Sequence, residues 1–483
     1  MLATRGAVAS RIAPRPHGAR SEWWSRIRSA GAFSGTDAAA KGAVFLALVV
    51  AARVLGPSGF GEFVLVYTAA QIAALLADMG LTTLVLRQGA RSGRMHQAPL
   101  WTAVALNVGA SLVCALGLVV AFAVFHPSAT SLAAIYVPTL LLLTVTTSLE
   151  GAAIAARRPV RVATCRLAGN SCVLVLTIVL LSTRPAPELV AVAFLVGGIA
   201  KLACIAASTR SHVPGIAVRP RLAAPLLRRG APFYGSAIAA FLYQRVDVLL
   251  LGALAGVAVA GEYAAAYRIL DGTLLVPIAV VAAFLPSWTA RRRRDGGTQA
   301  ASSVVPILAC VGVLVGVELV LARTLIVDLL FGDAYASAAP VLAILALSVP
   351  LFYTNIALVW IAYAGGFERR VAAVGVVALI SNVPLNIVLI RVLDGVGAAV
   401  ATVVTEAVVC VGYAFTLGLQ RRLERAGVLR ALASVGAYAG LMLAFAVVSV
   451  TLHAPAAASC LVAAAMGAAL LALVYRHESH ASA

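Results

Sequence analysis

Long apolar stretches, separated by short segments with charged residues, Pro or Gly, restrict how this chain can fold more than any other feature. A bilayer core of about 30 Å needs about 20 residues of helix. Only 11% of the 483 residues are charged and 62% are hydrophobic, whereas soluble domains contain about 25% charged residues. The sequence therefore predicts an all-α polytopic membrane protein with about 14 transmembrane helices. The predicted spans are 30–54, 60–84, 98–124, 131–156, 162–182, 186–208, 230–254, 260–288, 300–322, 337–363, 371–391, 396–419, 431–450 and 457–475.

The positive charge of the chain follows this pattern of spans. Lys and Arg number 37 against 18 Asp and Glu. If the N-terminal tail is cytoplasmic, most of the basic residues fall in the cytoplasmic connections, as the positive-inside rule requires. The run of arginines at 291–294 lies at such a connection, so it gives no separate reason to expect nucleic acid as a partner. We predict that both termini are cytoplasmic.

Several classes of protein do not fit the sequence. No connection is longer than roughly 25 residues, so no folded domain is expected outside the membrane. No GxxxxGK[ST] motif and no HExxH motif occur, so ATP hydrolysis and a metal site are not expected, and no cofactor is predicted. The seven Cys residues all lie in apolar runs and are interpreted as packing residues. Short loops and scattered intramembrane charges favour a secondary transporter or flippase over an enzyme.

A short motif occurs twice. Residues 61–67 read Gly-Glu-Phe-Val-Leu-Val-Tyr, and residues 261–267 read Gly-Glu-Tyr-Ala-Ala-Ala-Tyr. The two copies open the second and the eighth predicted span, which is an even offset, so both enter the membrane from the same side. This arrangement predicts two halves that are related by an axis along the membrane normal.

The motifs also carry a family resemblance. The first half contains Arg-Val-Leu-Gly-Pro-Ser-Gly-Phe-Gly-Glu-Phe at 53–63 and Ala-Asp-Met-Gly-Leu at 77–81. The second half contributes 245–252, 261–268, 284–286, 331–335, 382–386, 395–402 and Glu406. In order and spacing these segments, within about residues 30–419, resemble bacterial polysaccharide-biosynthesis flippases of the multidrug/oligosaccharidyl-lipid/polysaccharide exporter superfamily.

The resemblance implies a fold and a function. The fold has two six-helix lobes around a central cavity, followed here by two further helices. The function is to move undecaprenyl-diphosphate-linked oligosaccharides from the inner to the outer leaflet of the bacterial plasma membrane. The expected division is a basic tail at 1–29, lobes at 30–208 and 230–419, a linker at 209–229, two helices at 420–475 and a cytoplasmic tail at 476–483.

A wet, cationic cavity is needed to carry a diphosphate past hydrocarbon. Arg245, Arg268 and Asp271 lie near mid-depth in the seventh and eighth predicted spans and are the leading substrate-binding candidates. Arg245 is the preferred diphosphate ligand because a guanidinium group can pair with two oxygens. Arg268 and Asp271 are three residues apart, so they could equally form a structural ion pair. Asp247 lies about 200° around the helix from Arg245 and should point elsewhere.

Other intramembrane charges have weaker assignments. Lys41 is a further substrate candidate, although its spacing from Asp37 favours a packed ion pair. Asp78 and Glu406 are lone carboxylates that either bind a coupling proton or sodium ion or form interhelical hydrogen bonds. Four charges near span ends are left out of the site, since the basic ones among them can reach the headgroups. They are Glu150, Arg166 and Lys201 near the cytoplasmic ends and Glu318 near the outer end.

The expected partners are a lipid-linked glycan, membrane lipids, a coupling ion and polysaccharide polymerase machinery. Two other functions stay open. A multidrug or cation exporter of the same superfamily would need an acidic, aromatic-lined pocket, and a membrane glycan polymerase or glycosyltransferase would be expected to carry a larger outer loop.

Overall fold

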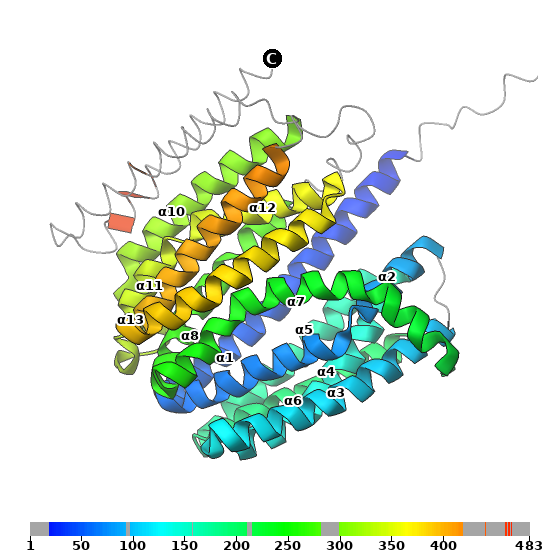
Figure 1. Ribbon diagram of the computed structural model, residues 1–483, viewed down its shortest axis with the longest axis horizontal. Helices are drawn as coiled ribbons and strands as arrows, with labels where there is room; N and C mark the ends of the chain where they lie inside the picture. Colours follow the sequence, from blue (N-terminus) through cyan, green and yellow to red (C-terminus); the bar gives the residue numbers. More distant parts are fainter. Residues whose placement is uncertain are drawn as a thin grey trace, which may run out of the picture.

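The computed structural model describes residues 19–92, 97–156, 158–209, 215–281 and 299–418, with a few single positions near the C-terminus. Every regular element in these ranges is a helix (Figure 1). Eight helical stretches in this part of the chain are long and apolar enough to cross a membrane. The prediction of an all-α, multi-pass membrane protein is confirmed. The number fourteen stays a prediction, because the spans at 431–450 and 457–475 lie almost wholly outside the described residues, as do the arginines at 291–294.

Two of the helices are of double length. Helix α1 (Ala19–Asp78) is two helices joined at a kink at Gly56, where φ is 68°. Helix α13 (Glu368–Gly418) is joined in the same way at Asp394, where φ is 49°. A positive φ favours glycine, so Gly56 suits its kink. Each double helix covers most of two predicted spans, and both kinks fall inside the predicted gaps at 55–59 and 392–395. The predicted span at 60–84 runs past the end of α1 at Asp78 into α2.

The first helix group is formed by α1 and the five helices that follow it. Helix α5 packs against α1 and α6, and α4 packs against α6 and α3. On α3 the side chains of Val113, Leu116 and Val124 are exposed, as expected for a helix that faces lipid. The members after α1 are α2 (Leu81–Ser92), α3 (Gln97–Phe125), α4 (Thr130–Ala155), α5 (Pro159–Thr183) and α6 (Pro187–Thr209).

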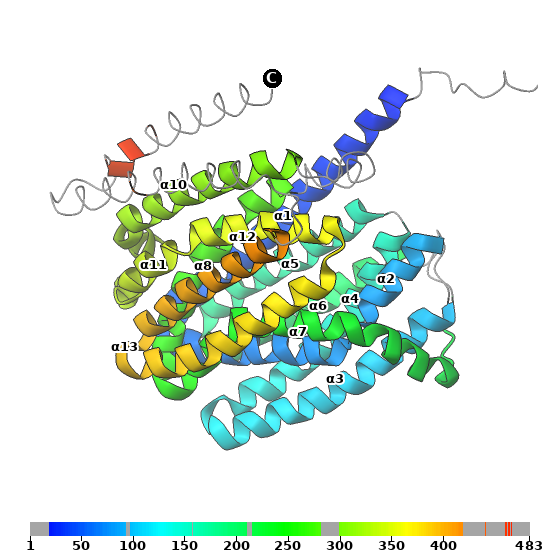
Figure 2. The same ribbon diagram turned by 45° about the horizontal axis from the view of Figure 1, so that its top comes forward.

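The second helix group begins with α7, which runs between the first group and the rest of the second in both views (Figures 1 and 2). Helix α7 packs mainly against α13, and α10 packs against α12. Helices α11 and α12 meet at a bend of 45°, so the predicted span at 337–363 is broken. The members before α13 are α7 (Ala223–Leu254), α8 (Val257–Thr273), α10 (Gln299–Leu330), α11 (Ala338–Ala346) and α12 (Val349–Gly365).

The two groups touch mainly where α1 meets α8, and α1, α2 and α3 also contact α7. A methyl group at Gly61 would overlap the carbonyl oxygen of Val257, and a methyl group at Gly261 would overlap that of Pro57. Small residues allow two backbones to approach this closely inside a membrane. The first residue of each copy of the repeated motif is therefore a contact point between the two groups.

The interpretation of every cysteine as a packing residue is wrong for one pair. Cys165 of α5 and Cys204 of α6 form a disulfide, with Cα atoms 5.4 Å apart. The two residues are 39 positions apart in the sequence, and they face each other because α5 and α6 pack side by side. Sequence spacing alone does not reveal this pairing.

Candidate functional site

Three of the predicted site residues meet between α7 and α8. Arg245 Nη2 lies 3.3 Å from Asp271 Oδ2, and Arg268 Nη1 lies 3.0 Å from the same oxygen. Arg245 comes from α7, whereas Arg268 and Asp271 lie one turn apart on α8. The structure therefore joins both arginines through one carboxylate, and we call these three residues the arginine cluster.

Two tyrosines support the arginine cluster. The guanidinium of Arg245 lies over the ring of Tyr267 at 5.1 Å, and that of Arg268 lies over the ring of Tyr67 at 5.9 Å. The face of an aromatic ring attracts a cation, so each ring holds one guanidinium in place. From the sequence, no role is predicted for these tyrosines. A signal was present, because Tyr67 and Tyr267 are the last residues of the two copies of the repeated motif.

The arginine cluster has more hydrogen-bond donors than Asp271 can accept from. A guanidinium group carries five N–H donors, and here two such groups share the single carboxylate of Asp271. Within the part of the chain that the structure describes, Nε of Arg268 is buried and has no hydrogen-bond partner. A buried donor without a partner costs free energy. The arrangement suits an anion with several oxygens, since each guanidinium can pair with two of them.

Asp247 serves a different purpose from Arg245, its near neighbour on α7. Its carboxylate is buried and accepts hydrogen bonds from the Tyr263 hydroxyl and from the backbone N–H of Val248. The Tyr263 hydroxyl also lies 3.1 Å from the hydroxyl of Thr402. Asp247 thus ties α7, α8 and α13 together, on the side of α7 that helical geometry predicts to lie away from Arg245.

Lys41 belongs to a second set of charges, inside the first helix group. Lys41 Nζ lies 3.0 Å from Asp37 Oδ2, in the packed ion pair that the spacing favours. Arg166 Nη1 lies 2.8 Å from Asp37 Oδ1, and Arg166 Nη2 lies 2.8 Å from Glu150 Oε2. Lys201 Nζ completes the set at 4.0 Å from Glu150 Oε1. We call these five residues the α1–α6 charge network.

From the sequence, Arg166 and Lys201 are expected to reach the headgroups; the structure instead pairs both with carboxylates of the first helix group. Helices α1, α4, α5 and α6 pack closely, so an arginine on α5 reaches carboxylates on α1 and α4. Pairing inside the helix group replaces the headgroup contacts that long basic side chains otherwise seek. Lys41 is tied to Asp37 here and is half exposed, at 52%.

Asp78 and Glu406 lie in different helix groups and have different surroundings. Asp78 Oδ1 accepts hydrogen bonds from the backbone N–H and the hydroxyl of Thr82 and from the amide of Asn107. It caps the start of α2, a structural role. Glu406 is 2% exposed and accepts a hydrogen bond of 2.8 Å from the side-chain amide of Asn355. Among the described residues Asn355 is the one side-chain hydrogen-bond partner of Glu406, which leaves Glu406 the freer of the two carboxylates.

Comparisons with known structures place the fold. The lipid II flippase MurJ in an inward closed conformation matches with a TM-score of 0.71 and 14% identity, over 92% of this chain and 97% of MurJ. An inward-facing multidrug resistance MATE family transporter of the MOP superfamily matches with a TM-score of 0.62 and 16% identity, over 81% and 94%. A MOP superfamily transporter from Pyrococcus furiosus, described as having a binding pocket of reverse polarity, matches with a TM-score of 0.58 and 14% identity, over 85% and 96%.

Sequence comparison gives the family. No curated protein matches the sequence. The profile of the polysaccharide biosynthesis protein family matches residues 28–290, which is more than half of the chain. This range includes the whole arginine cluster and the α1–α6 charge network. The chain therefore belongs to the polysaccharide biosynthesis protein family.

Proposed function

We propose that the protein is a flippase that moves an undecaprenyl-diphosphate-linked oligosaccharide from the inner to the outer leaflet of the bacterial plasma membrane. The glycan then enters cell-surface polysaccharide synthesis. In this proposal residues 30–208 and 230–419 act as two lobes that open alternately to either side. Both termini lie in the cytoplasm, and the protein performs no chemistry on its substrate.

The arginine cluster is the observation that supports the proposal most. A diphosphate presents several oxygens and a negative charge, which two guanidinium groups can bind in fork geometry. The cluster lies between the helix groups, since Tyr67 on α1 and Tyr267 on α8 hold its two arginines. A ligand bound there contacts both proposed lobes. Asp271 holds the two guanidinium groups together while no anion is present.

The rival exporter function fits the arginine cluster poorly. A multidrug or cation exporter shares the fold, as the MATE match shows, but a cationic substrate would be repelled by two guanidinium groups that share one carboxylate. The tyrosine faces, which could otherwise attract a cation, are already covered by Arg245 and Arg268. The anionic lipid substrate is therefore the better match to the charge of the cluster.

The test is a leaflet assay. The purified protein is reconstituted into vesicles with a fluorescent undecaprenyl-diphosphate-linked sugar, and the fraction accessible to a quencher outside is followed with time. We expect the fraction of fluorescent lipid that is protected from the quencher to decrease with time only in vesicles that contain the protein. In cells, deletion of the gene should leave the intermediate on the inner leaflet and remove the surface polymer. Normal surface glycan with altered drug susceptibility would support the exporter, and a shortened polymer on exported units would support the polymerase.

We also propose that Glu406, rather than Asp78, binds the coupling ion. Glu406→Gln keeps the shape of the side chain and removes its charge. In this variant we expect an imposed proton or sodium gradient to stimulate flipping at least about ten-fold less than in the wild type. Loss of the buried carboxylate charge should weaken ion binding by more than about 1.4 kcal/mol. Asp78→Asn should retain the stimulation. The measurement is the leaflet assay with and without the gradient, and an unchanged response of Glu406→Gln would rule out its coupling role.

A further inference from the structure

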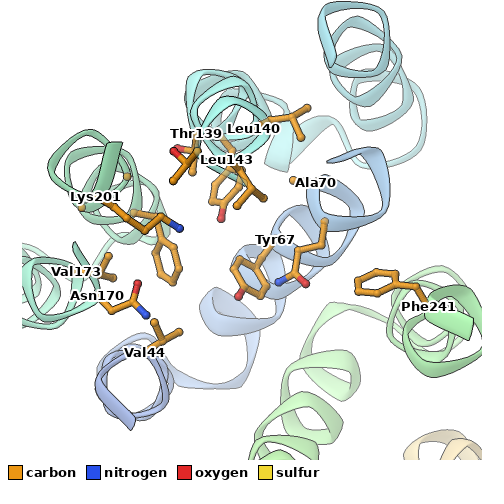
Figure 3. A pocket seen from close by; sticks show the side chains of 16 residues that line it. Val44, Tyr67, Ala70, Thr139, Leu140, Leu143, Asn170, Val173, Lys201 and Phe241 are labelled. Carbon is orange, nitrogen blue, oxygen red and sulfur yellow. The ribbon is translucent and has the colours of Figure 1, made fainter. Parts of the chain in front are cut away.

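A cavity of about 350 Å³ lies inside the first helix group (Figure 3). This volume is within the usual range for ligand sites, about 300–1,000 Å³. Helices α1, α4, α5 and α6 supply most of its lining, and Phe241 of α7 contributes on the side of the second group. The cavity adjoins the arginine cluster through Tyr67, which lines the cavity and also carries the guanidinium of Arg268 on its ring.

The lining combines aromatic faces with hydrogen-bonding groups. The rings of Tyr67, Tyr136 and Phe194 contact one another, with centroids 5.5–6.4 Å apart. Polar side chains lie around these rings: Gln71, Thr139, Thr146 and Asn170. Among the described residues, the buried hydroxyl of Thr139 has no hydrogen-bond partner. A sugar ring has an apolar C–H face, which packs on aromatic rings, and a rim of hydroxyls, which need hydrogen-bond partners.

Lys201 gives the cavity its charge. Among the described residues that line the cavity it is the one ionisable side chain apart from the tyrosines. Figure 3 shows its amino group directed into the space that Tyr67 and Asn170 also border. Its side chain is 18% exposed, and its ion pair with Glu150 is long, at 4.0 Å. Arg166 already binds Glu150 and Asp37 at 2.8 Å each. The α1–α6 charge network thus has three cations and two carboxylates, and the surplus positive charge borders the cavity.

We propose that this cavity binds an acidic sugar of the lipid-linked glycan, with Lys201 pairing with the sugar carboxylate. The inference rests on the proposed flippase function and adds the class of glycan. The position of the cavity beside the arginine cluster agrees with the covalent structure of the substrate. Because the first sugar is bonded directly to the diphosphate, its site must adjoin the diphosphate site, and Tyr67 is shared by both.

The test measures binding of three synthetic probes to the full-length protein in nanodiscs. The probes are a short-chain polyprenyl diphosphate without sugar, one that carries glucose and one that carries glucuronic acid. We expect the wild type to bind the glucuronate probe about 10- to 100-fold more tightly than the glucose probe, as for a partly buried charged hydrogen bond. Lys201→Met should remove this preference and leave the affinity for the bare diphosphate unchanged.

Two further variants separate the site from general effects of charge and folding. Lys41→Met removes a cation from the same network at a half-exposed position that does not line the cavity, and it should keep the preference. Gly198 lines the cavity, and a Cβ there would meet nothing closer than Leu142, at 3.7 Å. Gly198→Ala should therefore fold, fill part of the cavity and lower the affinity for both sugar probes towards that of the bare diphosphate.

The outcomes distinguish the two proposals. Equal binding of the glucose and glucuronate probes by the wild type, or a preference that survives Lys201→Met, would overturn the acidic-sugar site. Those results would leave the flippase proposal intact. Undiminished binding of the bare diphosphate by Arg245→Ala would instead count against the arginine cluster as the diphosphate site, and so against the proposed function.

Discussion

Replacement of Arg245 and Arg268 together by alanine is expected to slow flipping by at least about 100-fold. Each replacement removes charged hydrogen bonds to the diphosphate, and each bond contributes about 1.5–3 kcal/mol. A ten-fold change in rate corresponds to about 1.4 kcal/mol. The double variant also leaves Asp271 as a partly buried carboxylate without its two partners, so a negative charge faces the substrate. The leaflet assay on reconstituted protein measures the effect.

The single variants sharpen this prediction. Arg245→Lys keeps the positive charge but loses the planar fork, so we expect an intermediate loss. Arg323→Ala is the matched control, because Arg323 donates its side-chain hydrogen bond to Val320 within its own helix, and it should flip as the wild type does. If the double alanine variant flips at the wild-type rate, the arginine cluster is a structural ion pair and the diphosphate binds elsewhere.

The spans and the arginine cluster could be predicted because both depend on local sequence. Hydropathy locates a span without knowledge of its neighbours. The depth of Arg245, Arg268 and Asp271 follows from counting about 1.5 Å per residue along two helices that are adjacent in the chain. The same counting separated Asp247 from Arg245, and the structure shows Asp247 bound to Tyr263. These predictions needed no information on how distant helices pack.

The remaining features depend on helices that are distant in the sequence. Arg166 binds Asp37, which is 129 residues away, and Glu150, which is 16 residues away. The pairing of Cys165 with Cys204 likewise exists only because α5 lies against α6. A charge near the end of a span can reach either headgroups or a buried partner, and hydropathy does not distinguish the two. The cavity that Lys201 lines therefore could not be found from the sequence.

A single methyl group at either glycine of the repeated motif should have a large effect, because it would overlap backbone atoms of the other helix group. We expect Gly61→Ala and Gly261→Ala each to reduce flipping by at least about ten-fold and to destabilise the protein by about 1–3 kcal/mol, the usual cost of overpacking. The obstacle at each position is a backbone carbonyl oxygen, of Val257 and of Pro57 respectively. A carbonyl oxygen cannot rotate aside as a side chain does, so α1 and α8 must move apart.

This contact is one of those that join the two helix groups, so its loss should be visible as local opening rather than as general unfolding. Hydrogen–deuterium exchange of residues 55–62 and 255–262 should rise in both variants, with a lower thermal unfolding midpoint. Gly117→Ala is the control, since a Cβ there meets nothing within 4 Å and alanine favours helix more than glycine does. Unchanged flipping and exchange in both glycine variants would mean that the two groups do not need this close contact. The alternating-access movement would then depend on another interface.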